Sequence, residues 1–244
     1  MITWQQRAVF RALLARQWFV VGRQLPDMFG DGLIAVSLQV IMLKYFLPAM
    51  GMATQWQVPL FIGNMMMLCF TIGFQYGIGL TNDIATSKVL HYHASLPLSP
   101  RWTIISYLAG AMLSFFVLLV PVGMIGSWFL SSSDALHGSI AASIVMGLLV
   151  VLFFSLMFTY LSVRFSPEIY LDNMWPRLLG PMFTLGCLLF TWHRIHTFSP
   201  KVSYLFLLSP ATYCVEGLRH ALLGDPQYLS LPLCMGMVTL FCIT

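Results

Sequence analysis

The stretch IAASIVMGLLVVLFFSLMFTYLSV, residues 140–163, contains no charged side chain and is almost entirely apolar. About 20 such residues in a helix are enough to cross a hydrocarbon core of roughly 30 Å. Three other runs have the same character and contain no Asp, Glu or Arg: 32–48, 58–80 and 103–130. The sequence therefore predicts an all-α membrane protein in which these four segments cross the bilayer.

The composition argues against a water-soluble protein. Hydrophobic residues make up 59% of the chain and charged residues only 8%, whereas about a quarter of a soluble domain is charged. The twelve Lys and Arg are scattered between the apolar runs and form no basic stripe, so we expect no nucleic-acid partner. The five cysteines form no CxxC pair, and we interpret them as small buried apolar residues.

The N-terminal stretch 1–24 combines Trp4 and Trp18 with four arginines. Aromatic and basic residues together suit a helix that lies at the level of the lipid headgroups. A secretory signal has a short apolar region and a small-residue cleavage site, but the first long apolar run begins only after this stretch. We therefore expect a retained interfacial helix.

The last third of the chain is less regular. The apolar runs 178–192 and 229–244 predict a fifth and a sixth span, which gives one transmembrane domain over residues 1–244. Between them, 199–223 contains segments too short or too polar to cross alone, so we expect an outer re-entrant helical hairpin that packs against neighbouring helices. The run 229–244 covers only about 24 Å at 1.5 Å per residue. Either the sixth helix ends at the inner face or a natural tail follows Thr244.

The distribution of basic residues predicts the orientation. Eight Lys and Arg fall on one side of the six-span arrangement and three on the other. The eight are Arg7, Arg11, Arg16, Arg23, Lys88, Arg101, Arg164 and Arg177, and the three are Arg194, Lys201 and Arg219. Because basic residues are enriched in cytoplasmic segments, we expect both termini to face the cytoplasm.

The motifs of soluble and membrane-embedded enzymes are missing from the sequence. His193 and His196 are spaced to share a helix face, but no Asp, Glu or Cys lies within a turn of them to complete a metal site. No Gly-rich segment ends in Gly-Lys-Ser or Gly-Lys-Thr, so the chain has no phosphate-binding loop for ATP. All eight acidic residues lie outside the predicted spans. We expect no catalytic residue, metal or cofactor on this chain.

Polar residues inside the first two predicted spans are candidates for lining a translocation path: Gln39, Lys44, Asn64 and Gln75. A charge inside a span indicates function by default, but Lys44 is close enough to the outer interface for its ammonium to reach the headgroups. The amides either line a path or form hydrogen bonds between helices.

The loop HYHASLPLSPR, residues 91–101, resembles a segment of the type-2 ABC transporter permeases, the membrane subunits of small bacterial exporters. In that family a short coupling helix is followed by Pro-Leu-Ser and a basic residue at the start of the third span. Two prolines restrict the chain here, as suits a short rigid element that a partner could push. The resemblance implies that the ATPase-coupling residues are Ser95, Leu96, Pro97, Leu98, Ser99, Pro100 and Arg101.

The segment LSPATYCVEGLR, residues 208–219, is similar to the Asn-Pro-x-x-Tyr-x-x-x-x-x-Arg segment that precedes the last helix in the same family. Ser209 replaces the usual Asn, and we expect it to cap the helix that Pro210 begins. The resemblance places an outer hairpin here, and Glu216 and Arg219 have the i, i+3 spacing of an ion pair at the outer interface. The hairpin residues are Pro210, Tyr213, Glu216 and Arg219.

Both resemblances imply a multi-pass permease of the bacterial cytoplasmic (inner) membrane that acts as a homodimer or pseudo-dimer. Its two copies would enclose a path between their first, second and fifth helices. Two cytoplasmic ABC ATPase subunits would hold ATP and Mg²⁺ and dock on the coupling loop and the N-terminal helix. The exported substrate would be hydrophobic or amphiphilic, such as a drug, a lipid or a glycan-lipid.

Two alternatives remain open. A secondary transporter usually carries inverted repeats and mid-membrane carboxylates, and the sequence shows neither. A membrane-embedded enzyme or a non-transporting assembly factor would also be polytopic, but the missing nucleophile and metal ligands argue against the enzyme.

Overall fold

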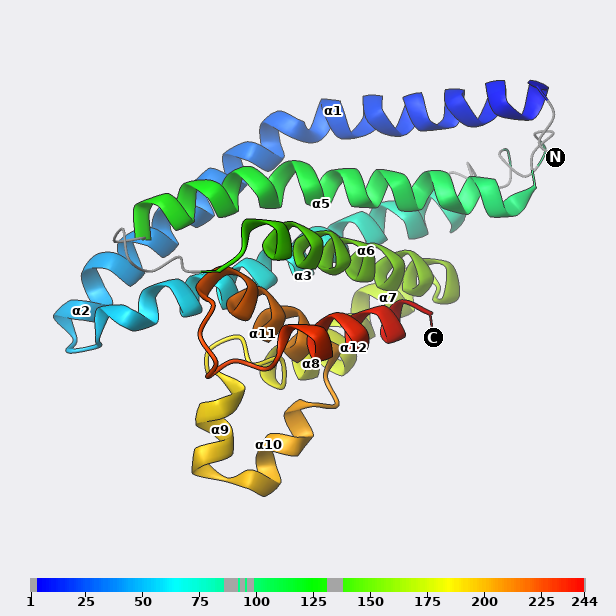
Figure 1. Cartoon of the computed structure of the whole chain (residues 1–244). Coiled ribbons are helices and arrows are strands. Elements are labelled where there is room, and N and C mark those ends of the chain that lie inside the picture. The colour runs from blue at the N-terminus through cyan, green and yellow to red at the C-terminus, as the bar shows by residue number, and fades with distance from the viewer. Residues whose placement is uncertain (1–3, 86–91, 93–94, 96–98, 131–137, 244) are drawn as a thin grey trace.

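Four long helices form the body of the protein in the computed structural model, which describes residues 4–85, 92, 95, 99–130 and 138–243. They are α1 (Trp4–Ile41), α3 (Gln57–Ala85), α5 (Pro100–Leu130) and α6 (Ile140–Arg164), and they pack side by side (Figure 1). Each belongs to a helical segment long and apolar enough to cross a membrane. The described residues contain no strand. The protein is therefore all-α, with four candidate membrane-spanning helices.

The first helix is longer than expected. α1 continues through residues 25–31, so the N-terminal helix expected over 1–24 and the beginning of the span expected over 32–48 are one element. Pro26 lies inside it, where it removes one backbone hydrogen bond and favours a bend. Packing along α5 holds the two parts of α1 together, and Figure 1 shows α1 bent along its course beside α5.

The end of the first span is a widened helix. The π-helix η1 (Met42–Phe46) and the short α2 (Leu47–Ala49) carry the chain from α1 to a turn, and the 3₁₀-helix η2 (Thr54–Trp56) then leads into α3. Pro48 explains the widening, because proline cannot donate the hydrogen bond that an α-helix needs at this position.

The segment expected to form a continuous fifth helix over 178–192 is interrupted. After α7 (Pro167–Met174), the π-helix η3 (Trp175–Leu179) and α8 (Gly180–Thr184), no helix is formed until α9 (Trp192–Phe198). Cys187 has a positive φ of 54°, which an α-helix does not accommodate. Apolar composition alone therefore does not make this run one span.

Three helices complete the chain: α10 (Pro200–Phe206), α11 (Pro210–Leu223) and α12 (Leu231–Ile243). α9 and α10 project from the body in Figure 1, whereas α11 and α12 pack against α6. The region expected to be a hairpin, 199–223, thus consists of one projecting helix and one packed helix. α11 ends at Gly224, whose φ of 68° closes the helix in the left-handed conformation. The expected sixth span is the short apolar helix α12.

The core lies between α3, α5, α6 and α11, and large aromatic side chains fill it. Phe154 contacts Phe70 and Phe158 with ring centroids 5.2 and 6.3 Å apart. Gly73 allows α3 to approach α6 closely, because a Cβ at this position would overlap the ring of Phe158. Apolar packing and small residues at helix contacts are the usual means by which membrane helices associate.

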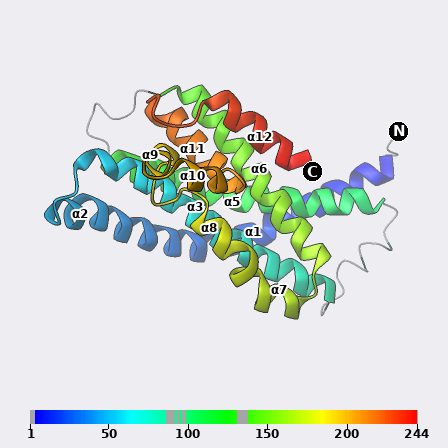
Figure 2. The ribbon, with the colours of Figure 1, turned by 90° about the horizontal axis from the view of Figure 1, so that it is seen from below.

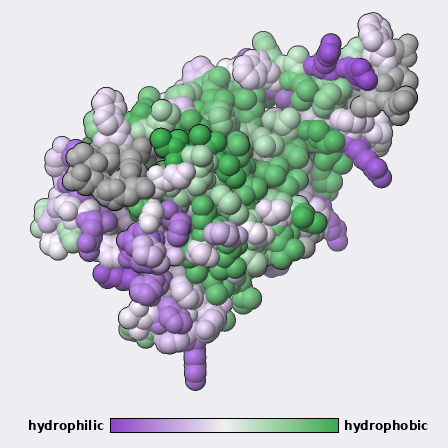
Figure 3. Space-filling model, viewed as in Figure 1, coloured by the Kyte–Doolittle hydropathy of each residue, from purple (hydrophilic) through white to green (hydrophobic). Residues whose placement is uncertain are grey.

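The surface agrees with a membrane location. Figure 3 shows a broad hydrophobic area over the middle of the molecule and hydrophilic residues gathered toward its two ends. Both termini lie toward the same end of the long helices, opposite the turn after α2, in Figures 1 and 2.

Candidate functional site

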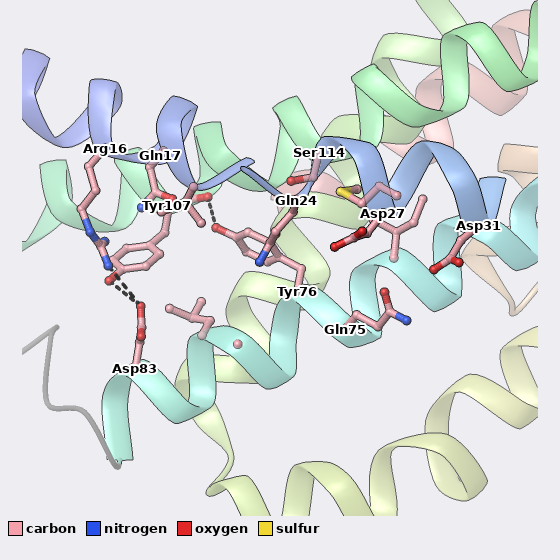
Figure 4. Close-up of a pocket in the computed structure, with 15 residues that line it drawn as sticks. Arg16, Gln17, Gln24, Asp27, Asp31, Gln75, Tyr76, Asp83, Tyr107 and Ser114 are labelled. Atoms are coloured by element: carbon pink, nitrogen blue, oxygen red, sulfur yellow. Dashed lines mark hydrogen bonds and ion pairs between the residues drawn. The ribbon is translucent and has the colours of Figure 1, made fainter. Parts of the chain in front are cut away.

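A polar groove lies between α1, α3 and α5, within the otherwise apolar bundle (Figure 4). Its volume is about 420 Å³. The lining residues are Arg16, Gln17, Val20, Gln24, Asp27, Met28, Asp31, Ile72, Gln75, Tyr76, Gly79, Leu80, Asp83, Tyr107 and Ser114. Polar and charged side chains are costly inside a bundle of membrane-spanning helices, so their concentration in one groove makes it the candidate functional site.

The continuity of α1 creates one wall of the groove. Gln17, Gln24, Asp27 and Asp31 follow one another at intervals of seven, three and four residues. These intervals place the four side chains on one face only if the helix is unbroken from 17 to 31. The bend at Pro26 does not disturb this register, since the residues on both sides of it line the same groove.

The groove begins at the end of the bundle where α3 stops at Ala85 and α5 starts at Pro100, which we call the loop end. A guanidinium nitrogen of Arg16 lies 3.7 Å from Oδ2 of Asp83, and the Tyr107 hydroxyl donates to the same oxygen at 3.3 Å. The hydroxyl of Tyr76 donates to the carbonyl of Tyr107 at 2.5 Å. These contacts join α1, α3 and α5 around the groove (Figure 4).

Farther from the loop end the polar groups are less well paired. Asp27 and Asp31 are exposed to the groove, and neither forms a hydrogen bond or ion pair with any residue that the structure describes. Gln17 is only 6% exposed, yet its amide makes no hydrogen bond within the described part of the chain. The amide of Gln17 is therefore available to hydrogen-bond a ligand or water in the groove.

The groove is equipped for non-covalent binding. Over the described residues, no group of three or more His, Cys, Asp and Glu side chains is placed to hold a metal ion. Its lining offers carboxylates, amides, phenols and one guanidinium, together with apolar side chains of Val20, Met28, Ile72 and Leu80. This combination suits a ligand with a polar head and an apolar body.

The structure brings one of the four expected path-lining residues to the groove. Gln75 lines it, whereas Gln39, Lys44 and Asn64 lie elsewhere. The ammonium of Lys44 donates to the carbonyl of Phe129 at 3.0 Å and so ties the first span to the end of α5. Gln39 has a buried amide oxygen without a hydrogen-bond donor among the described residues, and Asn64 is half-buried in α3.

A second polar cluster surrounds Arg219, which is fully buried in α11. Its guanidinium donates to Oε1 of Glu216 at 2.9 Å, so the expected ion pair is formed, but it is buried within the protein and not exposed at an interface. The same group also donates to four backbone carbonyl oxygens, at 2.8 to 3.3 Å: those of Pro59, Cys187, Leu188 and Phe190. Glu216 in turn accepts a hydrogen bond from the backbone nitrogen of Trp192 at 3.3 Å.

This Arg219 cluster explains how the break between α8 and α9 is stabilised. Three of the four carbonyl groups belong to residues 185–191, where no helix is available to satisfy them. Buried carbonyl groups need a hydrogen-bond donor, and the five N–H groups of an arginine can serve several at once. Burial raises the pKa of the Glu216 carboxyl, and the neighbouring Arg219 guanidinium opposes that rise.

The other expected hairpin residues also lie in α11 and its first turn. Pro210 begins the helix, and Tyr213 is buried with its ring centroid 6.2 Å from that of Phe241. Ser209 occupies the N-cap position, but its side chain makes no capping hydrogen bond. Its hydroxyl donates instead to the carbonyl of Met182 at 3.5 Å, so the expected capping role is wrong. The hydroxyl is engaged with α8 instead of its own helix.

The expected coupling segment is described only in part. Leu96, Pro97 and Leu98 lie outside the described residues. Ser95 donates its hydroxyl hydrogen bond to the carbonyl of Tyr92 at 2.7 Å. Ser99 accepts from the backbone nitrogen of Trp102 at 3.0 Å, Pro100 begins α5 and Arg101 is exposed.

The N-terminal part of α1 contacts α5 close to this segment. The rings of Phe10 and Trp102 meet edge to face with centroids 5.1 Å apart. α1 and α5 then run in the same direction, since Gly32 faces Leu118 and Lys44 reaches Phe129. The start of α5, the start of α1 and the mouth of the groove are therefore neighbours at the loop end.

Most of the groove was missed from the sequence. Arg16, Asp27, Asp31, Asp83 and the two tyrosines were not expected to meet, because the first helix was expected to stop at residue 24 and no acidic residue was assigned to a span. The helical spacing of Gln17, Gln24, Asp27 and Asp31 was the available signal. Comparison with protein-family models, with curated proteins and with solved structures finds no match.

Proposed function

We propose that this chain is the permease subunit of an ATP-driven ABC exporter, and that it moves a hydrophobic or amphiphilic substrate out of the cytoplasm. The observation that carries the proposal is the polar groove among helices long enough to span a membrane. Charged and amide side chains inside such a bundle are costly, and they commonly mark a substrate pathway.

The position of the groove supports a link to a cytoplasmic motor. It starts at the loop end, where the segment that resembles a coupling helix joins α5. A push on this segment would act on α5 directly and on α1 through the Phe10–Trp102 contact. Both helices line the groove, so their displacement would change its width, as in other rigid-body transitions between helices.

The remainder of the proposal follows the family resemblance. The permease would have six spans and a re-entrant hairpin formed by α10 and α11, with both termini in the cytoplasm of a bacterial cell. Two permease copies, identical or homologous, would face each other across the path. Two separate ATPase subunits would bind ATP and Mg²⁺, because this sequence has no phosphate-binding loop.

A secondary transporter is the second candidate, and a specific observation favours it. Three carboxylates, those of Asp27, Asp31 and Asp83, line the groove from helices that belong to candidate spans. Carboxylates in such positions couple transport to ions or protons in many secondary transporters. The two functions differ in their energy source.

Copurification and reconstitution separate the two candidates. The tagged full chain, extracted from its native membrane, should bring an ATPase with it. The complex in proteoliposomes should then transport with ATP in the absence of an ion gradient, while the chain alone hydrolyses no ATP. Transport by the chain alone that follows a sodium or proton gradient would refute the ABC assignment and support the secondary transporter.

A further inference from the structure

The charges of the groove do not balance. Its lining contains one basic residue, Arg16, and three acidic residues, Asp27, Asp31 and Asp83. Arg16 lies against Asp83 at 3.7 Å, so this pair is largely compensated. Asp27 and Asp31 remain, one turn apart on α1, and within the described residues no cation lies within ion-pair distance of either. The groove therefore has an excess of two negative charges.

The chemistry beside these carboxylates is mixed. Met28 and Val20 lie on the same face of α1, and Ile72 and Leu80 face them from α3. Gln17 is a second, independent sign of a binding site, because this residue is only 6% exposed, lines the groove and makes no side-chain hydrogen bond with a described residue. A ligand that filled the groove would thus contact carboxylates, an amide and apolar surface together.

We infer that the groove binds lipophilic cations, with the positive group against Asp27 and Asp31 and the apolar part against Val20, Met28, Ile72 and Leu80. As a substrate class, this inference rests on the export function proposed above. An anionic amphiphile would be repelled by the excess negative charge, and a neutral one would leave both carboxylates desolvated without a partner. Both penalties disfavour these classes relative to a cation.

Two probes of the same shape and opposite charge test the inference: tetraphenylphosphonium and tetraphenylborate. The purified full chain is placed in lipid nanodiscs, and binding is measured by equilibrium dialysis, with empty nanodiscs subtracted to remove partitioning into lipid. We expect saturable binding of the phosphonium at least about tenfold tighter than that of the borate. The two nearby carboxylates attract the positive phosphonium and repel the negative borate.

The double variant Asp27→Asn, Asp31→Asn should weaken phosphonium binding by about tenfold or more, since it removes the excess charge at nearly constant volume. Asp172→Asn is the matched control. Asp172 is exposed on α7 and does not line the groove, so its loss should leave binding unchanged.

Equal binding of the two probes, no saturable phosphonium binding, or unchanged affinity in the double variant would each overturn the inference. If the double variant does not stay monodisperse, the comparison of the two probes on the wild-type chain decides alone. The assay needs neither ATP nor a partner. Phosphonium binding without any copurifying ATPase would therefore refute the ABC proposal and leave the inference standing. A copurifying ATPase without phosphonium binding would refute the inference and leave the ABC proposal standing.

Discussion

Two arginines of this chain pair with a carboxylate, but their surroundings differ. Arg219 is buried, lies 2.9 Å from Glu216 and donates to four carbonyl groups of the backbone. Arg16 is about one-third exposed and lies 3.7 Å from Asp83, beside a groove whose other carboxylates have no close cation in the described chain. Every guanidinium nitrogen of Arg219 has an acceptor, and this cluster holds the fold although Oε2 of Glu216 is buried without a hydrogen-bond partner among the described residues. The carboxylates of the groove have fewer partners and are accessible to a ligand or a moving partner.

The largest effect is expected at Arg219. Arg219→Leu should lower the free energy of unfolding by about 3–5 kcal/mol, because it leaves a buried carboxylate and several carbonyl groups without a donor. Thermal unfolding of the purified protein in detergent measures the loss. Arg219→Lys, which keeps the charge but not the planar fork, should recover only part of it.

Exchange of the two charges sharpens this prediction. The double variant Glu216→Arg, Arg219→Glu keeps one positive and one negative charge but has no hydrogen-bond donor at position 219. The carbonyl groups of the non-helical segment 185–191 therefore stay without a donor. We expect the double variant to be as unstable as Arg219→Leu. Recovery of wild-type stability would mean that the ion pair alone, and not the backbone hydrogen bonds, makes the cluster important.

An intermediate effect is expected at Gly63, where α3 passes the non-helical segment 185–191. A Cβ at this position would overlap the carbonyl of Leu188, one of the groups bound by Arg219. Gly63→Ala should therefore cost about 1–3 kcal/mol through forced displacement. Gly147→Ala is the control, since a Cβ there meets no atom within 4 Å. It should keep or slightly raise the melting temperature, as alanine is the better helix former.

A small effect on stability, with a large effect on transport, is expected in the groove. Asp83→Asn removes a partly exposed ion pair and should change the free energy of unfolding by only about 0–1 kcal/mol. Transport should nevertheless fall in proteoliposomes, because the link between α1, α3 and α5 at the loop end is weakened. A loss of stability like that of Arg219→Leu would show that the groove is structural after all.

The smallest effect on stability is expected in the coupling segment. Leu98→Asp should leave membrane abundance normal, weaken association with the ATPase and abolish export, because it would bury an unpaired carboxylate against the partner. Phe198→Asp places the same charge at a residue that is 92% exposed on α9, away from the loop end. It should keep the ATPase bound. Normal ATPase binding and export in Leu98→Asp would remove this segment from the mechanism.

The long apolar helices could be predicted from the sequence, because burial in lipid requires little more than length and hydropathy. The helices α3, α5 and α6 cover the runs expected to cross the membrane. The first helix was divided because the apolar run begins only at residue 32, after the Trp- and Arg-rich stretch 1–24, whereas contacts with α5, distant in sequence, sustain one continuous helix.

The interruption of the fifth segment could not be predicted for a similar reason. Residues 178–192 are apolar enough for a helix, and the groups that satisfy its break come from Arg219. The spacing of Glu216 and Arg219 did predict their pairing, since i, i+3 neighbours meet on any helix. It could not indicate that the pair is buried, because burial depends on what packs around α11.

The proline in α1 has a mechanical consequence. The part of the helix from Trp4 to Pro26 is an arm of about 33 Å at 1.5 Å per residue, and Pro26 is its natural fulcrum. A rotation of this arm by about 5° would move its tip by about 3 Å while the part beyond the fulcrum stays in place. Gln24 and Asp27 line the groove on either side of Pro26. The same small rotation would therefore change the distance between these two side chains. A displacement of a few ångströms at the N-terminal tip of α1 would thus produce a much smaller change in the distances between groove residues close to Pro26.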